Sequence, residues 1–256
     1  YGPDEHSRLL YPANIHSYKN TYKPYVSHSN MAILKLGIDD AGRGPVIGPM
    51  VLAGCLIDEE IEKEFKNIGV KDSKQLTPKR REYLANIIKE KAETFEIVVI
   101  NPNEIDGTDS KNPRIKLNEL EAIACAKIIN LINKGYNKIK VIIDCPSPNI
   151  TKWTDFLKTK IDNLSNLEIS CEHKADKNHV SVSAASIIAK HIREKEMDKL
   201  REKYGSEIGT GYCSDPLTCR FLEKYAMKHE SDGIFRKTWS TWKDLCARRE
   251  QMKLEF

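Results

Sequence analysis

The chain has 256 residues, of which 40% are apolar, and a formal net charge of +4 at pH 7. This length suits one large domain or a domain with an appendage, and so mild a charge argues only weakly for a polyanionic partner. No run approaches the roughly 20 consecutive apolar residues of a membrane helix, and the start carries no secretory pattern, so we expect a soluble, cytoplasmic protein without membrane association.

Residues 1–30 differ in composition from the rest of the chain. They are rich in Tyr, Ser, Asn, Pro and His, and their apolar residues follow neither the period of a strand nor that of a helix. We expect this segment to be a poorly structured extension outside the core. Residues 31–215 are expected to form the main domain, and residues 216–256 a helical C-terminal region.

Beyond residue 30, predicted strands alternate with predicted helices. Apolar runs predict strands, whereas apolar residues at helical spacing and capping residues predict helices. The predicted strands cover residues 33–38, 50–57, 95–100, 139–144 and 167–171. The predicted helices follow Pro78, cover residues 117–132, 153–164 and 183–204, follow Pro216, and cover residues 239–252. This order predicts an α/β fold with a mixed sheet, antiparallel at its start, flanked by helices and extended by C-terminal helices.

Acidic residues end two of the predicted strands. Asp39 and Asp40 end the first strand, in the segment GIDDAGRGPVIGP, and Asp144 ends the strand IKVIID. Strand ends of an α/β sheet usually form the edge at which ligands bind. Carboxylates crowded there repel each other unless a hard cation lies between them, and Mg²⁺ prefers carboxylate oxygens. Together with Asp176, these acids predict a metal site.

Each acid also has a plain structural interpretation. An Asp at a strand end commonly caps a turn, and Asp176 lies in HKADKNHVSVS, a segment that is equally typical of a loop ahead of a helix. The glycines after Asp40 are what a tight turn between two strands needs in any case. Spacing alone therefore leaves the metal site and the structural roles open.

A set of five ordered motifs is more specific. The motifs are GIDDAGRGPVIGPMVLAG (37–54), DSKQLT (72–77), IIDCP (142–146), KADKNHVSVSAASIIAK (174–190) and GTGYCSDPLT (209–218). This set resembles ribonuclease HII, the type 2 ribonuclease H family, and most of all its archaeal branch. IFRKTWST (234–241) resembles the C-terminal motif of the family. The resemblance leaves out only the first thirty residues, and it implies a ribonuclease H-like catalytic domain over residues 31–215.

The resemblance implies roles for individual residues. The four acids implied to be catalytic and to hold the metal ions are Asp39, Asp40, Asp144 and Asp176. The residues implied to bind substrate are Gly42, Arg43 and Gly44, which read the ribose 2′-hydroxyl, Tyr212, which packs on the sugar, and Ser73, Lys74 and Ser183, which approach phosphates. A packed loop tyrosine and small residues for close helix packing are the plain alternatives for Tyr212 and Ser183.

One residue departs from the family pattern. The family has Glu directly after the first Asp, whereas this chain has Asp40, whose side chain is shorter by one carbon–carbon bond, or about 1.5 Å. Three histidines surround the fourth acid, but water activated by two metal ions needs no histidine base, so no role is assigned to them. We still expect an active enzyme, but one with a lower rate or a shifted metal preference.

The implied activity is that of an endoribonuclease. It cleaves the RNA strand of RNA–DNA hybrids and cuts on the 5′ side of single ribonucleotides embedded in duplex DNA, which removes ribonucleotides and primers and leaves 3′-hydroxyl and 5′-phosphate ends. Two Mg²⁺ or Mn²⁺ ions are the implied cofactor, and hybrid and ribonucleotide-containing duplexes are the implied partners of a monomer. A sliding clamp is a further candidate partner, for which the C-terminal QMKLEF is a weak match.

Two other functions stay open. One is a nuclease of the same fold with another substrate, such as a resolvase or a ribonuclease that acts on hybrids alone. The other is a hybrid-binding protein in which the shortened Asp40 has disabled catalysis. Cleavage of a duplex with one embedded ribonucleotide distinguishes the first alternative, and restoring Glu at position 40 distinguishes the second.

Overall fold

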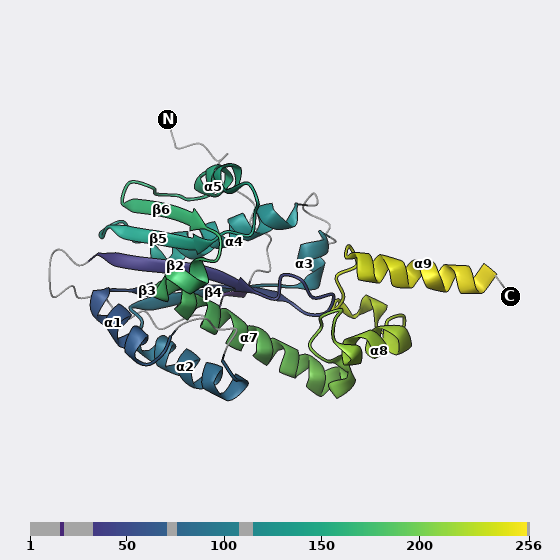
Figure 1. The fold of residues 1–256 in the computed structure, drawn as a ribbon. Coiled ribbons are helices and arrows are strands. Elements are labelled where there is room, and N and C mark those ends of the chain that lie inside the picture. The colour runs from purple at the N-terminus through teal and green to yellow at the C-terminus, as the bar shows by residue number, and fades with distance from the viewer. Residues whose placement is uncertain (1–15, 18–32, 71–75, 108–114, 255–256) are drawn as a thin grey trace.

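The computed structural model describes residues 16–17, 33–70, 76–107 and 115–254, and within these ranges it describes the side chains of residues 33–251. Its centre is a mixed sheet with the strand order β1-β4-β3-β2-β5-β6 and helices on both faces (Figure 1). The predicted α/β class with a mixed sheet, flanking helices and C-terminal helices is therefore confirmed.

The sheet combines an antiparallel and a parallel half. The three strands β2 (Leu34–Ala41), β3 (Met50–Ile57) and β4 (Thr94–Ile100) pair antiparallel in chain order. On the other side of β2, the strands β5 (Ile139–Asp144) and β6 (Leu167–Glu172) run parallel to it. Since β2 and β5 are parallel neighbours, their carboxyl ends lie at the same edge of the sheet.

The helices form a layer on each face of the sheet. The helices are α1 (Glu59–Asn67), α2 (Pro78–Lys91), α3 (Pro102–Asp106), α4 (Leu117–Ile132), α5 (Ile150–Lys158), α6 (Ala175–Asn178), α7 (Val180–Tyr204), α8 (Pro216–Tyr225) and α9 (Ser240–Leu254). α4 and α5 share one buried cluster with the sheet, whereas α1, α2 and α7 share another (Figure 1). Among the described residues, no helix is long and apolar enough to span a membrane.

The face to which each residue of β2 contributes follows from the alternation of side chains along a strand. Leu34, Leu36 and Ile38 are buried in the cluster with α4, and Ala41 is buried in the cluster with α7. Gly37 lies directly under α7, since a Cβ atom there would be 2.1 Å from the backbone carbon of Ser181. α7 therefore packs on the sheet more closely than any side chain at Gly37 would permit.

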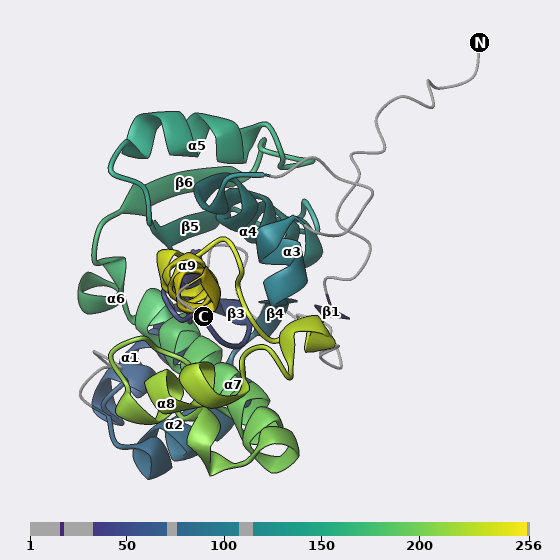
Figure 2. The ribbon, with the colours of Figure 1, turned by 90° about the vertical axis from the view of Figure 1, so that its right-hand side faces the viewer.

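The C-terminal helices share a third buried cluster with the connection between β2 and β3. Val46 and Ile47 from that connection pack with Phe221 of α8, with Trp242 of α9, and with Phe235, which lies between these two helices. Ile47 and Phe235 also form an isolated antiparallel β-bridge. α8 and α9 lie beyond the end of the sheet in Figure 1 and face the viewer in Figure 2. The C-terminal region therefore packs against the segment that follows Asp39 and Asp40.

The elements differ from the predicted ones at a few places. Helix α5 starts at Ile150, earlier than predicted, because the Asn149 side chain accepts a hydrogen bond from the Lys152 N–H group, and it ends at Lys158. Helices α1, α3 and α6 were not predicted. Within the segment expected to lie outside the core, strand β1 (His16–Ser17) pairs with β4, whose outer edge would otherwise be open.

Candidate active site

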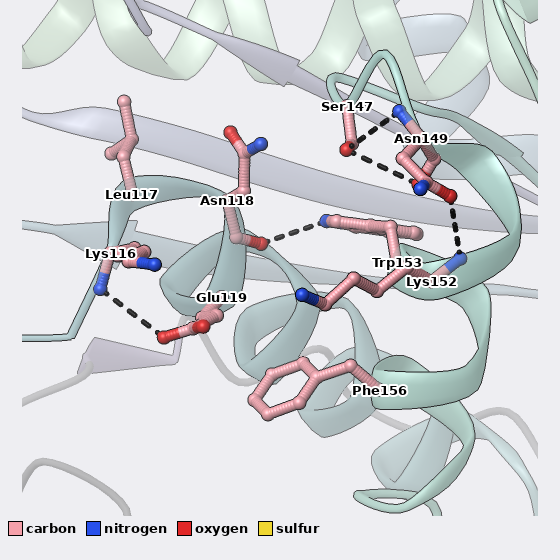
Figure 3. A pocket seen from close by; sticks show the side chains of 9 residues that line it. All are labelled: Lys116, Leu117, Asn118, Glu119, Ser147, Asn149, Lys152, Trp153 and Phe156. Carbon is pink, nitrogen blue, oxygen red and sulfur yellow. Dashed lines mark hydrogen bonds between the residues drawn. The ribbon is translucent and has the colours of Figure 1, made fainter.

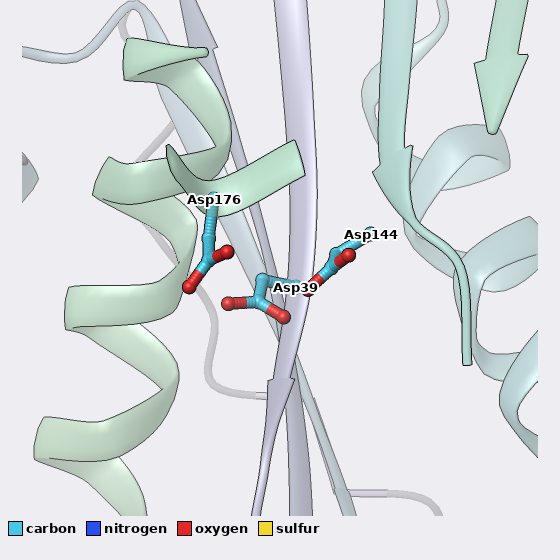
Figure 4. A group of neighbouring side chains, drawn as sticks. All are labelled: Asp39, Asp144 and Asp176. Atoms are coloured by element: carbon cyan, nitrogen blue, oxygen red, sulfur yellow. The ribbon is translucent and has the colours of Figure 1, made fainter. Parts of the chain in front are cut away.

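Three of the predicted acids meet at the edge of the sheet where β2 and β5 end. The register pairs Ile38 with Ile143, so Asp39 and Asp144 each follow by one residue and lie side by side. Asp176 reaches the same place from α6, the short helix between β6 and α7. One carboxylate oxygen from each of the three lies within 4.8 Å of the others, and the side chains converge (Figure 4). We call Asp39, Asp144 and Asp176 the acid cluster.

Hydrogen bonds from the backbone hold the acid cluster in place. The Asp39 carboxylate accepts from the Asp40 N–H group at 2.8 Å, and the Asp144 carboxylate accepts from the Ala175 N–H group at 3.2 Å. Lys174, directly before α6, has a φ of 60°, which is uncommon for a residue with a side chain. The turn into α6 is thus a specific conformation that sets Asp176 beside Asp144.

The charges in the acid cluster disfavour one another. Burial raises the pKa of Asp39 well above its usual value, and the nearby Asp40 and Asp144 carboxylates raise it further, whereas a hydrogen bond from Ser186 lowers it. Asp39 and Asp176 are 7% and 2% exposed, so water screens them little. Three carboxylate oxygens this close together, two of them from buried residues, fit a small divalent cation.

Asp40, the fourth predicted metal ligand, lies outside the acid cluster. As the next residue along β2, it points to the opposite face of the sheet, towards α4. Burial and, to a smaller extent, the Glu121 carboxylate raise the pKa of Asp40 to about 7, although Arg43 acts to lower it. Asp40 still lines one small hollow together with Asp39, Asp144 and Glu121, so it borders the acid cluster without joining it.

Glu121 is a buried acid that the sequence reasoning did not identify. It is 1% exposed, and burial raises its pKa to about 6 although Arg43 acts against this. Arg43 donates from Nε to the Glu121 carboxylate at 2.8 Å and from Nη2 to the Asn118 side chain at 2.5 Å. The Arg43 side chain is therefore held against α4. No sequence signal separates Glu121 from the other acids of α4.

The connection between β2 and β3, residues 42–49, places its glycines next to Tyr212; we call it the glycine-rich turn. A Cβ atom on Gly44 would lie 3.8 Å from the Tyr212 ring, and Tyr212 is 39% exposed. The N–H groups of Val46 and Ile47 donate to the Gly211 carbonyl at 2.9 and 3.2 Å. Two segments about 170 residues apart in sequence, as their numbers show, thus form one exposed surface beside the acid cluster.

Gly42 requires glycine for two reasons. Its φ is +82°, and a Cβ atom there would lie 2.2 Å from Nε of Arg193. Arg193, which is buried, also lies over the Tyr212 ring at 5.1 Å and donates to the Thr210 carbonyl at 3.1 Å. Arg193 therefore connects the two halves of this surface, a role that the sequence reasoning did not assign.

Ser73, Lys74 and Ser183 are the remaining predicted substrate contacts. Ser73 and Lys74 lie outside the described residues. Ser183 is buried, and its hydroxyl group lies 2.5 Å from the Asp176 carbonyl oxygen, to which it donates. In this structure Ser183 thus helps to hold α6 and its aspartate, and its contact with a substrate phosphate stays a prediction.

A larger hollow adjoins the acid cluster. It has a volume of about 420 Å³ and lies between the start of α4 and α5, with Lys116, Lys152 and Phe156 among its lining residues (Figure 3). Trp153 lines both this hollow and the small one beside the acids, and its ring N–H group donates to the Asn118 carbonyl at 2.8 Å (Figure 3). Trp153 therefore lies between this hollow and the small one beside the acid cluster.

Known proteins resemble this chain over most of its length. The sequence model of the family described as ribonuclease HII matches residues 36–242. A ribonuclease HII from Methanococcus maripaludis is 44% identical over 222 residues, which cover 86% of this chain and 90% of the relative.

Solved structures agree with the sequence comparison. The ribonuclease H2 of Pyrococcus horikoshii has 36% sequence identity and a TM-score of 0.74, and the match covers 84% of this chain and 98% of that one. A chain in the PCNA:RNase HII complex from Archaeoglobus fulgidus has 34% identity and a TM-score of 0.69, with 81% and 96% covered. This chain belongs to the ribonuclease HII family.

Proposed function

We propose that this chain is a metal-dependent endoribonuclease that cleaves the RNA strand of RNA–DNA hybrids and cuts on the 5′ side of single ribonucleotides embedded in duplex DNA. Membership of the ribonuclease HII family supports the reaction class. One observation carries the choice of substrate: the acid cluster lies directly beside a glycine-rich turn and an exposed tyrosine. Carboxylates that fit a cation are thereby placed next to backbone that a sugar can approach closely.

The residues of the acid cluster would hold Mg²⁺ or Mn²⁺, with Asp40 as the fourth ligand of the proposal. Bound divalent ions supply an activated water nucleophile and neutralise the charge that develops on the phosphate and the leaving oxygen. Asp39 and Asp176 are buried, so they would hold an ion at the inner side of the site. Burial and the neighbouring carboxylates raise the pKa of Asp39, and a bound cation would offset this by stabilising the charged form.

The glycine-rich turn and Tyr212 would select the ribonucleotide. The 2′-hydroxyl is both a donor and an acceptor, and it is the group that distinguishes RNA from DNA at a given position. Gly42 and Gly44 have no side chain to keep a sugar away from the backbone groups of the turn. The Tyr212 ring, next to Gly44, would pack on the same sugar. Ser73, Lys74 and Ser183 are proposed to approach the flanking phosphates.

The decisive experiment is a cleavage assay on a duplex that carries one ribonucleotide in one strand. We expect a cut on the 5′ side of that ribonucleotide in Mg²⁺ or Mn²⁺, with a 3′-hydroxyl and a 5′-phosphate at the new ends. An all-deoxy duplex of the same sequence is the control and should stay intact. Cleavage of long hybrids without cleavage at the single ribonucleotide would instead favour a hybrid-only ribonuclease.

Removing one charge from the acid cluster separates binding from chemistry. Asp39→Asn and Asp144→Asn should abolish turnover and leave duplex binding largely intact, because neither residue lies on the proposed sugar-reading surface. Binding should weaken as salt rises, since each phosphate contact releases counterions. Full activity of either variant would remove that residue from the proposed metal site.

A second function, a hybrid-binding protein without catalysis, is favoured by one observation. Asp40 lies outside the acid cluster, and its carboxylate is nearer to the Glu121 side of β2. If the wild type binds hybrids but does not cleave them, and Asp40→Glu cleaves, the chain is such a binding protein. Activity of the wild type itself excludes this reading.

The proposal extends to partners and organisation. A PCNA complex of a relative supports a sliding clamp as a partner of this chain. We treat residues 31–215 as the catalytic domain and residues 216–256 as the helical region that completes the substrate surface. The protein is proposed to act as a monomer in the cytoplasm. Gel filtration and a clamp pull-down with the full chain test these two points.

A further inference from the structure

A buried arginine from the C-terminal region holds the glycine-rich turn. Arg236 is 0% exposed, and its guanidinium donates to the carbonyl of Gly42 at 2.6 Å, to that of Arg43 at 2.7 Å, and to that of Gly48 at 2.9 and 3.1 Å. These contacts join residues 188 to 194 positions apart. Within the described residues Arg236 has no carboxylate within salt-bridge distance, so the backbone of the turn is its main partner.

Holding a carbonyl group also sets the direction of the N–H group that follows it. A peptide unit is planar and trans, so its C=O and N–H groups point in opposite directions. The Gly42 and Arg43 carbonyls point at the buried guanidinium. The N–H groups of Arg43 and Gly44 therefore point away from it, and Gly44 is exposed beside Tyr212. These two N–H groups are donors of the kind that a sugar hydroxyl accepts from.

The neighbours of Arg236 complete this support. Trp239 lies under the guanidinium at 5.1 Å and donates from its ring N–H group to the Gly44 carbonyl at 3.0 Å. Asp106 at the end of α3 accepts from the N–H groups of Lys237 and Thr238 at 2.6 and 3.1 Å. The carbonyl groups of residues 42, 43 and 44 thus all accept hydrogen bonds from Arg236 or Trp239. The hydrogen bonds to Asp106 in turn hold this segment against the core.

We propose that Arg236 is a positioning residue for ribose recognition: it fixes the peptide units of the glycine-rich turn so that the N–H groups of Arg43 and Gly44 face the 2′-hydroxyl. This inference rests on the proposed function and assigns part of its selectivity to the C-terminal region. Arg236 remains charged at neutral pH, because burial and the nearby Arg193 lower its pKa only to about 9. It does not touch the substrate, so its effect is on selectivity and not on the chemistry itself.

The test is equilibrium binding in EDTA, where no cleavage occurs, with two duplexes that differ by one ribonucleotide. The quantity measured is the Kd for the all-deoxy duplex divided by the Kd for the ribonucleotide duplex. Lysine cannot reproduce the planar fork of arginine, so Arg236→Lys loses at least one of these hydrogen bonds. We expect the ratio to fall about fivefold, the effect of one net hydrogen bond, with the salt dependence unchanged.

Two further variants separate positioning from stability. Trp239→Phe keeps the ring and removes only the donor to Gly44, and it should lower the same ratio by a smaller factor. Ile132→Ala, in the core at the far end of α4, should lower the melting temperature and leave the ratio as in the wild type. If Arg236→Lys does not fold, Trp239→Phe and Ile132→Ala still decide the question.

The outcomes also distinguish this inference from the proposed function. An unchanged ratio in Arg236→Lys, or in Trp239→Phe where only that variant folds, overturns the positioning role. A wild-type ratio near 1 overturns it as well, because the turn then reads no sugar. In both cases, cleavage of an RNA–DNA hybrid by the wild type in Mg²⁺ would show that the nuclease assignment itself stands.

Discussion

Replacing Asp39 by Asn should make the metal-free protein more stable while it abolishes activity. Asn has nearly the shape of Asp, and its side-chain oxygen can still accept from the Asp40 N–H group, as the Asp39 carboxylate does at 2.8 Å. What the change removes is a buried negative charge within 4.8 Å of two others. Asp39 therefore lowers the stability of the metal-free protein, although activity requires it.

The size of the effect follows from the separation of the charges. Two unit charges 4.8 Å apart repel by about 3.5 kcal/mol at an effective dielectric constant of 20. The hydrogen bonds that Asp39 accepts from the Asp40 N–H group and from Ser186 stabilise its charge and offset part of this repulsion. We therefore expect a net gain of about 1 to 2 kcal/mol, or roughly 2 to 8 °C in melting temperature for a chain of this size.

Thermal melting in EDTA and in Mg²⁺ measures this effect. The wild type should melt higher in Mg²⁺, by about 2.7 kcal/mol in free energy at a hundred times the Kd, whereas Asp39→Asn should respond little. Asp162→Asn, a change at an exposed acid, is the matched control and should alter neither value. A variant that melts below the wild type in EDTA would refute the idea that the acid cluster is repulsive without a cation.

Three further predictions concern other parts of the molecule. Gly37→Ala should destabilise the fold by about 3 kcal/mol in urea unfolding, because the new Cβ atom would lie 2.1 Å from the backbone of Ser181. Asp40→Glu, which restores the residue of the family motif and lengthens the side chain by about 1.5 Å, should raise kcat in Mg²⁺ about tenfold; an unchanged kcat would show that the length of this side chain is not limiting. Burial and nearby lysines lower the pKa of His191 to about 4, so the folded protein disfavours its charged form. Stability should therefore fall as the pH drops from about 6.5 towards 4, less steeply in His191→Gln, as melting curves at each pH would show.

The elements that could be predicted from the sequence are those with a clear period and clear ends. β3 and α4 were predicted with the residues that the structure gives them, because an apolar run and a helical spacing of apolar residues are strong local signals. Helix α1 was missed although Asp58 caps it at the Ile61 N–H group, since Phe65 is its one buried residue. Ile61, Phe65 and Ile68 do lie at helical spacing and pack on the same cluster, but three apolar residues in a short charged segment are a weak signal.

The candidate site divides in the same way. Asp39 and Asp144 could be placed together because both end apolar strands, and parallel strands end at one edge. That Asp40 points to the other face also follows from the alternation along a strand, but its place beside Asp39 at the strand end led to the prediction that both belong to one metal site. Glu121 and Arg236 could not be predicted as partners of the turn, because their contacts span 78 and almost 200 residues.

The way the glycine-rich turn is supported explains why such permissive backbone can discriminate between two sugars. A turn with three glycines and two prolines has little structure of its own, and glycine loses the most conformational freedom when it is ordered. Here the ordering comes from outside the turn: Glu121 of α4 holds the Arg43 side chain, Arg193 of α7 packs on Gly42, and Arg236 holds the carbonyl groups. A probe for one hydroxyl group must be fixed to a fraction of an ångström, so its precision comes from segments that follow it far along the chain. Selectivity should therefore be lost through changes in those segments long before the acid cluster is disturbed.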